Sequence, residues 1–322
     1  MKLKLIIILF ATLINLFANE KIKIGVLAFG TVNWELEVLK HNNFDKKYGI
    51  EVEVVKLASK NAVSIALQSN SVDVIVNDWI WVNRQKASNK DISFYPYSKA
   101  VGALYVNDEK INSILDLKDK KLGIAGGSVD KTWLLFRAYS KKMYDKDLKN
   151  MLEPVFAAPP ILYKKMLDKS LSAAINFWHF NAKLDSKKMK RLLGVKEILN
   201  EFNINSDIPL IGWTFNSDYG RKNMKTINSF LQASYETKKL LSTSSEEWIR
   251  IKPLMKVKNE KMFEALKNGY INGTVKNFNK EHIESSKKVF DILYNEGGEK
   301  LVGKSKFLDE KIFWDFTPNI KW

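Results

Sequence analysis

The chain has 322 residues, of which 45% are hydrophobic and 12% aromatic, so it can bury a large core and is not intrinsically disordered. Its formal net charge is +16, but the lysines are spread along the chain beside acidic residues, which is typical of solvated faces and argues against a nucleic-acid partner. The sequence contains no cysteine, which excludes disulfides, thiolate metal sites, a cysteine nucleophile and a lipid-anchored cysteine.

The first residues, MKLKLIIILFATLINLFANE, have the pattern of a secretory signal peptide. A basic start is followed by an apolar stretch and by the small residue Ala18, after which cleavage is expected. Leu16 departs from the small residue preferred at the −3 position, and a retained membrane anchor is the alternative. The apolar stretch is short for a span, however. We therefore predict a signal peptide over residues 1–18 and a protein that diffuses freely in the periplasm.

The first half of the mature chain alternates strands with helices. A strand is expected over 21–28, a turn at Gly30 and a helix from about Asn33. A strand over 52–58, a helix through 62–69 and a buried apolar strand over 72–76 follow. This alternation predicts an α/β fold with parallel pairing.

A second α/β series begins near residue 117. The strand KLGIA leads through Gly126 and Gly127 into a helix, and a strand over 153–158, a proline-initiated helix over 159–170 and a strand over 171–176 come next. An apolar strand over 208–215 precedes a mainly helical C-terminal third, which we expect to pack mostly on the first lobe.

The two halves share a weak internal repeat. In the first, VDVIV is followed at once by Asn77 and Trp79, and in the second, LSAAIN ends in Asn176 and leads to Trp178. Open α/β sheets bind ligands at the carboxyl ends of their strands. The repeat therefore predicts two similar lobes that deliver polar and aromatic side chains to a cleft between them.

The segment GIAGGSVDKTW, residues 123–133, joins a strand to a helix through glycines. It fits neither the phosphate-binding GxxxxGK[ST] pattern nor the dinucleotide pattern GxGxxG. The free N–H groups at the helix start could bind an anionic or polar ligand atom, together with the Ser128 hydroxyl. Alternatively, the two glycines only form the turn, and Ser128 or Asp130 caps the helix.

Asp78 stands between Asn77 and Trp79, directly after a buried strand. Its carboxylate could meet a cationic or amide group of a ligand, or pair with Arg84 or Lys86. The alternative is that Asp78 caps the helix that follows.

Aromatic residues gather at the predicted strand ends. Their faces could stack on a planar ligand or surround a cation, although core packing is the simpler explanation for any single ring. These residues are Phe29, Trp34, Trp79, Trp81, Trp133, Phe177, Trp178 and Trp213.

The three histidines, His41, His179 and His282, lack the spacing of a metal site, so we expect no bound metal. His179 either lines the predicted cleft or lies at the surface.

The chain resembles the substrate-binding proteins of ABC importers in the nitrate/sulfonate/bicarbonate group (NitT/TauT, SsuA/THI5-like), which includes binders of thiamine precursors. The segments that carry the resemblance are KIKIGVLAFGTVNWELEVLK, ALQSNSVDVIVNDWIWVNRQ, ILDLKDKKLGIAGGSVDKTW and IPLIGWTF. It implies a type II periplasmic-binding-protein fold, in which two α/β lobes with mixed sheets flanked by helices are joined by two hinge crossovers. The implied lobes are 19–105 with 209–322, and 106–208, with crossovers near Leu104–Asn107 and Ile208–Trp213.

The resemblance also implies a ligand site built from three segments. They map onto Phe29, Gly30, Thr31, Asn33 and Trp34; onto Asn77, Asp78 and Trp79; and onto Gly126, Gly127 and Ser128. From the repeat and the aromatic pattern we add Asn176, Trp178 and Trp213. Asp78 would repel a small oxyanion unless a base such as Arg84 neutralised it, which favours an uncharged or cationic organic ligand, such as a planar heterocycle.

We therefore expect a monomeric periplasmic protein that captures a small molecule and delivers it to an ABC permease in the inner membrane. It should need no cofactor and catalyse no reaction, because the pyrimidine-synthase branch of this superfamily carries a cysteine-rich motif that this chain lacks. Two alternatives stay open. One is a small-molecule enzyme on the same fold, and the other is an accessory binding protein of a periplasmic dehydrogenase or sensor.

Overall fold

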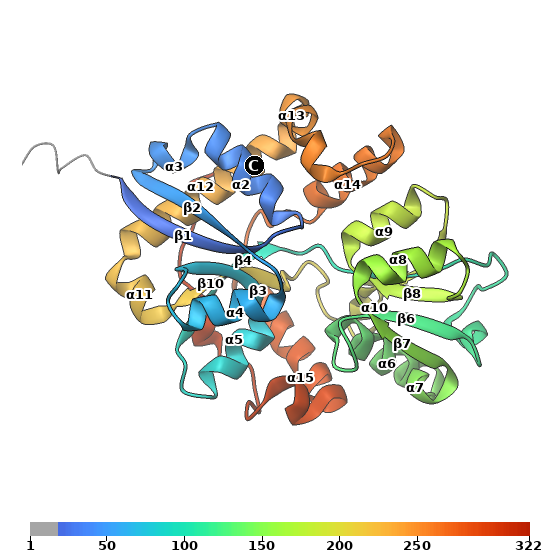
Figure 1. Cartoon of the computed structure of the whole chain (residues 1–322). Helices are drawn as coiled ribbons and strands as arrows, with labels where there is room; N and C mark the ends of the chain where they lie inside the picture. The colour runs from blue at the N-terminus through green and yellow to red at the C-terminus, as the bar shows by residue number, and fades with distance from the viewer. Residues whose placement is uncertain (1–18) are drawn as a thin grey trace, which may run out of the picture. The chain divides into compact units, whose positions relative to one another are not determined.

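The computed structural model describes residues 19–322 (Figure 1). The predicted signal peptide, residues 1–18, lies outside the described residues. Contacts within the chain group into two compact units. The first unit holds the described residues up to Ile75 together with Asp218–Thr243 and Phe316–Trp322, and the second holds Val76–Ser217 and Ser244–Asp315. No helix within residues 19–322 is long and apolar enough to cross a bilayer.

The first sheet has five strands in the order β2-β1-β3-β10-β4. β1 is parallel to β2 and β3, whereas β10 is antiparallel to β4. β3 starts and ends two residues later than predicted, so that Asn77 and Asp78 belong to the strand. The strands are β1 (Glu20–Leu27), β2 (Ile50–Leu57), β3 (Val74–Asp78), β4 (Ile92–Ser98) and β10 (Ile211–Asn216).

The second sheet also has five strands, in the order β7-β6-β8-β5-β9. β6 is parallel to β7 and β8, and β5 is antiparallel to β8 and β9. Both sheets are therefore mixed, as the resemblance implied, although the sequence pattern did not predict β4, β5 or β9. The strands are β5 (Ala103–Val106), β6 (Lys121–Ala125), β7 (Glu153–Ala157), β8 (Ala173–Asn176) and β9 (Lys190–Gly194).

A buried ion pair joins two helices of the first unit. Lys238 Nζ lies 2.5 Å from Glu35 Oε2, and the Ser234 hydroxyl donates to Glu35 Oε1 at 2.6 Å. Burial lowers the pKa of Lys238 more than its attraction to Glu35 raises it. The helices of this unit are α2 (Val32–His41), α3 (Phe44–Lys47), α4 (Lys60–Gln68) and α12 (Met224–Thr243), and α11 (Ser217–Lys222) begins at its boundary.

Helices flank the second sheet, and further helices follow β10 in the chain. The longest, α15, is interrupted at Gly298, whose φ of 54° is one that glycine adopts without strain. The helices of the second unit are α5 (Trp79–Lys86), α6 (Lys131–Tyr144), α7 (Leu148–Met151), α8 (Pro159–Leu167), α9 (Trp178–Asp185), α10 (Val195–Glu201), α13 (Ser245–Met255), α14 (Glu260–Asn272) and α15 (Lys280–Val302), with 3-10 turns at Ile114–Leu117 and Glu310–Ile312.

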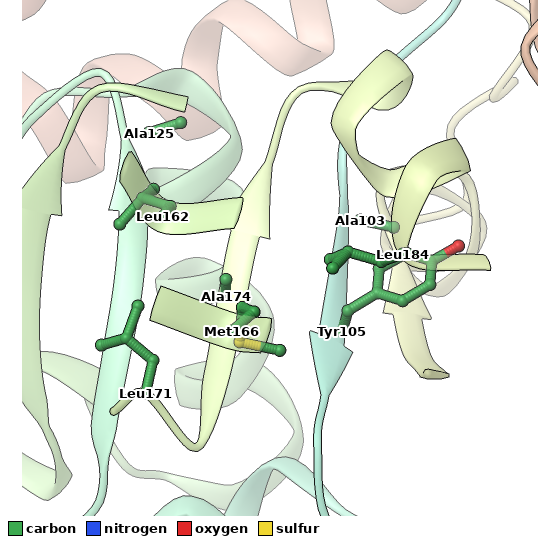
Figure 2. Close-up of a cluster of buried hydrophobic side chains, with 8 residues drawn as sticks. All are labelled: Ala103, Tyr105, Ala125, Leu162, Met166, Leu171, Ala174 and Leu184. Carbon is green, nitrogen blue, oxygen red and sulfur yellow. The ribbon is translucent and has the colours of Figure 1, made fainter. Parts of the chain in front are cut away.

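One core cluster lies where α8 and α9 cover the second sheet (Figure 2). Small alanines on the strands leave room for larger side chains on the helices, as close packing requires. Gly123 of β6 leaves room in the same way, because a Cβ there would lie 2.6 Å from Leu171 and 2.8 Å from Leu162. The cluster comprises Ala103, Tyr105, Ala125, Leu162, Met166, Leu171, Ala174 and Leu184.

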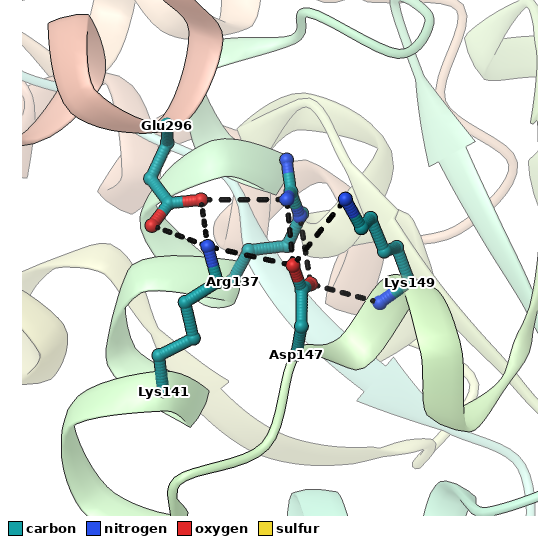
Figure 3. Close-up of polar contacts among 5 residues, drawn as sticks. All are labelled: Arg137, Lys141, Asp147, Lys149 and Glu296. Atoms are coloured by element: carbon teal, nitrogen blue, oxygen red, sulfur yellow. Dashed lines mark hydrogen bonds and ion pairs between the residues drawn. The ribbon is translucent and has the colours of Figure 1, made fainter.

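A network of charged side chains ties α6 to α15 (Figure 3). The Arg137 guanidinium donates to both oxygens of Asp147, at 2.8 and 2.7 Å, and lies 3.5 Å from Glu296. Lys141 reaches the same two carboxylates from the next turn of α6, at 3.4 and 2.8 Å. The three side chains at its centre, Arg137, Asp147 and Glu296, are each about one-tenth exposed.

Candidate functional site

The predicted repeat is present in the local structure of both sheets. Asn77, near the end of β3, accepts a hydrogen bond on its side-chain oxygen from the N–H of the next residue at 2.9 Å. Asn176, the last residue of β8, does the same at 2.8 Å. A helix begins at Trp79 in the first case and at Trp178 in the second. In each sheet an asparagine therefore makes the same local hydrogen bond two residues before the tryptophan at which a helix begins.

The Asp78 carboxylate contacts both α5 and α6. One of its carboxylate oxygens accepts a hydrogen bond from the Trp81 N–H at 2.8 Å and so caps α5, as the alternative interpretation held. The other lies 2.9 Å from Nζ of Lys131, the first residue of α6. The Asp78 side chain is 8% exposed and that of Lys131 is 27% exposed.

The base that lies beside Asp78 is Lys131 and not Arg84, which we had named as an example of a residue that could neutralise it. Burial opposes protonation of Lys131, but the charge and hydrogen bond of Asp78 outweigh it, and the pKa of Lys131 is raised. Arg84 lies elsewhere, against Gly303. A signal for Lys131 was present in the sequence. The N-terminus of a helix carries a partial positive charge, which repels a lysine in the first turn. A lysine at this position therefore indicates that a carboxylate lies nearby.

The glycine turn before α6 has the features of the structural interpretation, and its predicted ligand role stays a prediction. Gly126 and Gly127 have φ values of 106° and 102°, which favour glycine, and the Asp130 carboxylate caps α6 by accepting from the Trp133 N–H at 3.1 Å. Apart from its two chain neighbours, no residue among 19–322 has an atom within 4 Å of the position that a Cβ would take on Gly127, so the turn is open on that side.

A second lysine lies beside this turn. Nζ of Lys300, in α15, is 3.5 Å from the Ser128 hydroxyl oxygen. No pattern in the sequence connects Lys300 with Ser128, since the two residues lie on distant segments. With the first N–H groups of α6, Lys300 makes the surroundings of Ser128 favourable for a negatively charged group.

Some of the predicted aromatic residues are buried, and others are exposed to solvent. Trp79 and Trp213 are fully buried, and the Trp79 indole N–H donates to the Pro209 carbonyl at 3.2 Å. In this structure neither ring offers a face to a ligand, and their predicted ligand roles stay predictions. Trp178 and Phe177 keep exposed surface at the start of α9.

In the first unit, the loop after β1 holds the other predicted residues. Phe29 is 59% exposed, Trp34 is buried, and Gly30 has a φ of 116°. The Asn33 amide donates to the carbonyls of Leu27 at 3.0 Å and Gly30 at 3.2 Å. Its side-chain oxygen is buried and has no hydrogen-bond partner among residues 19–322, so it is available to a donor group. Thr31 precedes α2 and makes no side-chain capping bond.

His179 lies among aromatic rings at the start of α9, with its ring centroid 4.7 Å from that of Phe180 and 5.8 Å from that of Trp178. Burial, together with the charge of Lys183, lowers the pKa of His179 to about 4. Its imidazole is therefore neutral at physiological pH. Within residues 19–322, no three His, Asp or Glu side chains cluster as metal ligands would.

Comparisons with known proteins agree on one fold. The family model described as NMT1/THI5 like matches residues 37–241, which is more than half of the chain. The periplasmic aliphatic sulphonate binding protein SsuA from Escherichia coli is similar, with a TM-score of 0.73, 17% identity and 94% of each chain covered.

Two further solved structures are similar at lower scores. The alkanesulfonate-binding protein SsuA from Xanthomonas axonopodis gives a TM-score of 0.67 at 15% identity, covering 91% of this chain and 98% of that one. The nitrate-binding protein NrtA from Synechocystis gives 0.55 at 15% identity, covering 77% and 69%. At these identities the likeness shows the fold. No curated protein sequence matched the chain.

Proposed function

Because this chain belongs to the NMT1/THI5-like family, we propose that it is a periplasmic substrate-binding protein of an ABC importer. It captures a small organic molecule between two lobes, residues 19–105 with 209–322 and residues 106–208, and delivers it to a membrane permease without altering it. The observation that carries the proposal is the repeated strand end. Asn77 and Asn176 make the same local hydrogen bond near the carboxyl end of a strand in each sheet, where ligands of open α/β sheets bind.

The proposed ligand has an organic body and an anionic or acceptor group. Asp78 no longer argues against an anion, since Lys131 balances its charge at 2.9 Å. The turn at Gly126, Gly127 and Ser128, with Lys300 beside it, suits the anionic group. The body would contact the loop of Phe29, Gly30, Thr31, Asn33 and Trp34 and the strand-end residues Asn77, Asp78, Asn176 and Trp178. Contacts with Trp79 and Trp213 would require that these two buried rings become exposed.

A thermal-shift screen tests this function. The panel contains thiamine precursors, sulfonates, inorganic oxyanions and aromatic amines, and mass spectrometry follows each compound that raises the melting temperature. A true ligand at a hundredfold excess over its Kd should stabilise the protein by about 2.7 kcal/mol. The compound should be recovered unchanged. Chemical conversion would instead support an enzyme, and no stabilisation by any class would contradict the proposed ligand chemistry.

Matched variants test the site. Lys300→Gln removes the cation beside Ser128, and Lys304→Gln removes an exposed lysine from the segment just after α15. For an anionic ligand, we expect Lys300→Gln to weaken binding about tenfold and Lys304→Gln to leave it unchanged, because only the first charge would lie beside the bound group. Equal effects of the two variants would rule out the 126–128 turn as the anion subsite.

A further inference from the structure

A groove lies along the C-terminal half of α13, within the second unit. It is a shallow depression, largely open to solvent, and it is lined by Ile249, Lys252, Pro253, Lys256 and Val257. Ile249 is 65% exposed, and Leu254 on the same helix is 46% exposed. Large exposed apolar side chains beside a concavity are a common feature of interaction surfaces.

Lysines without acidic partners surround this groove. Across the part of the chain that the structure describes, Lys256, Lys258 and Lys183 have no carboxylate oxygen within 4.0 Å. Lys252 is the exception, because its ammonium group lies 2.5 Å from Glu260 and 4.5 Å from the ring centre of Phe263.

The ammonium groups also act on one another. Lys183, on α9, holds its Nζ 4.8 Å from the ring centre of Phe180. Burial lowers the pKa of Lys183, and the charges of Lys258 and Lys256 lower it further. The positive charge at this end of the groove is therefore uncompensated, and a negatively charged group placed there would relieve the repulsion.

We propose that this groove is a docking site for an acidic segment of a partner protein, which inserts an apolar side chain between Ile249 and Val257 and sets carboxylates against Lys256 and Lys258. Charge complementarity argues for an acidic occupant. Ile249, Pro253 and Val257 add apolar surface between the lysines, which suits a peptide that carries an apolar side chain beside its carboxylates.

The test uses a short synthetic peptide that alternates leucine with pairs of glutamate, labelled for fluorescence anisotropy, against the full mature protein. A second peptide carries glutamine in place of glutamate. We expect the glutamate peptide to bind, the glutamine peptide to bind at least about tenfold more weakly, and binding to weaken as salt is raised.

Two charge variants locate the binding. Lys256→Gln with Lys258→Gln should weaken the glutamate peptide about tenfold, since exposed charge pairs contribute modestly each. Lys187→Gln with Lys188→Gln, an equal loss of charge on exposed residues after α9, should leave binding unchanged. Ile249→Ser should weaken binding of the peptide without altering the melting temperature, because Ile249 is exposed.

Three outcomes would overturn the proposal. The first is equal binding of the two peptides, and the second is equal binding by the two lysine variants. The third is binding of phosphatidylglycerol vesicles through Lys256 and Lys258 with no binding of the peptide, which would assign the groove to a membrane surface.

Discussion

Arg137→Met should destabilise the protein through the charge network between α6 and α15 (Figure 3). The substitution keeps an aliphatic stem and removes two hydrogen bonds to Asp147, at 2.8 and 2.7 Å, and the attraction to Glu296 at 3.5 Å. Hydrogen bonds to charged groups contribute about 1.5–3 kcal/mol each, so the gross loss is about 3–6 kcal/mol.

The net loss should be smaller than this gross value. Lys141 stays 3.4 Å from Asp147 and 2.8 Å from Glu296, so neither carboxylate loses all of its neutralising charge. The arginine also no longer has to be desolvated on folding. We expect the free energy of unfolding, measured by urea denaturation, to fall by about 2–3 kcal/mol.

Lys149, which belongs to the same network, provides a control variant. Lys149 lies 3.8 Å from the same Asp147 but is 54% exposed, and Lys149→Met should cost less than about 1 kcal/mol. If the two variants lost equal stability, burial and hydrogen bonding would not be what makes Arg137 important. A double-mutant cycle between Arg137 and Asp147 should give a coupling of about 2 kcal/mol, and additive effects would refute the reasoning.

Three further predictions concern pH and packing. Burial would raise the pKa of Asp147, but its hydrogen bonds in the network outweigh burial and lower it below the ordinary 3.8. Asp147→Asn should therefore cost stability at pH 7, and its deficit should shrink as the pH falls below about 4 in acid-unfolding curves. The pKa of His179 is lowered from 6.5 to about 4, so NMR should show a neutral imidazole at pH 5.5. As the pH falls, the unfolded state binds a proton at His179 before the folded state does, and this destabilises the parent protein. His179→Asn should therefore lose less stability than the parent between pH 7 and pH 4. Gly269→Ala should lower the free energy of unfolding by about 1–3 kcal/mol in urea denaturation, because the new Cβ would lie 2.7 Å from Trp178. This loss should outweigh the better helix propensity of alanine. A gain in stability would show that the Trp178 ring moves freely.

Most of the fold could be predicted from the sequence because the signals are local. Alternating strand and helix patterns located β1, β2, β3, β6, β7 and β8, with errors of a few residues at their ends. The strands β4, β5 and β9 were missed. β5 is short, and all three pair in antiparallel with strands from distant segments, so nothing near them in sequence marks the partner.

In the candidate site, too, the features that depend on neighbouring residues could be predicted, and those that depend on distant residues could not. Local sequence accounts for the hydrogen bonds that Asn77 and Asn176 accept and for the caps at Asp78 and Asp130, because each of these bonds joins residues one to three positions apart.

The contacts between charged side chains and the burial of the aromatic rings depend instead on tertiary packing. It set Lys131 beside Asp78 and Lys300 beside Ser128, and it buried Trp79, which the sequence pattern had favoured as a ligand-facing ring. Contacts of this kind depend on how sheets and helices distant in sequence pack together. A residue's type shows which partner it needs, whereas the packing of the folded chain determines which partner it meets.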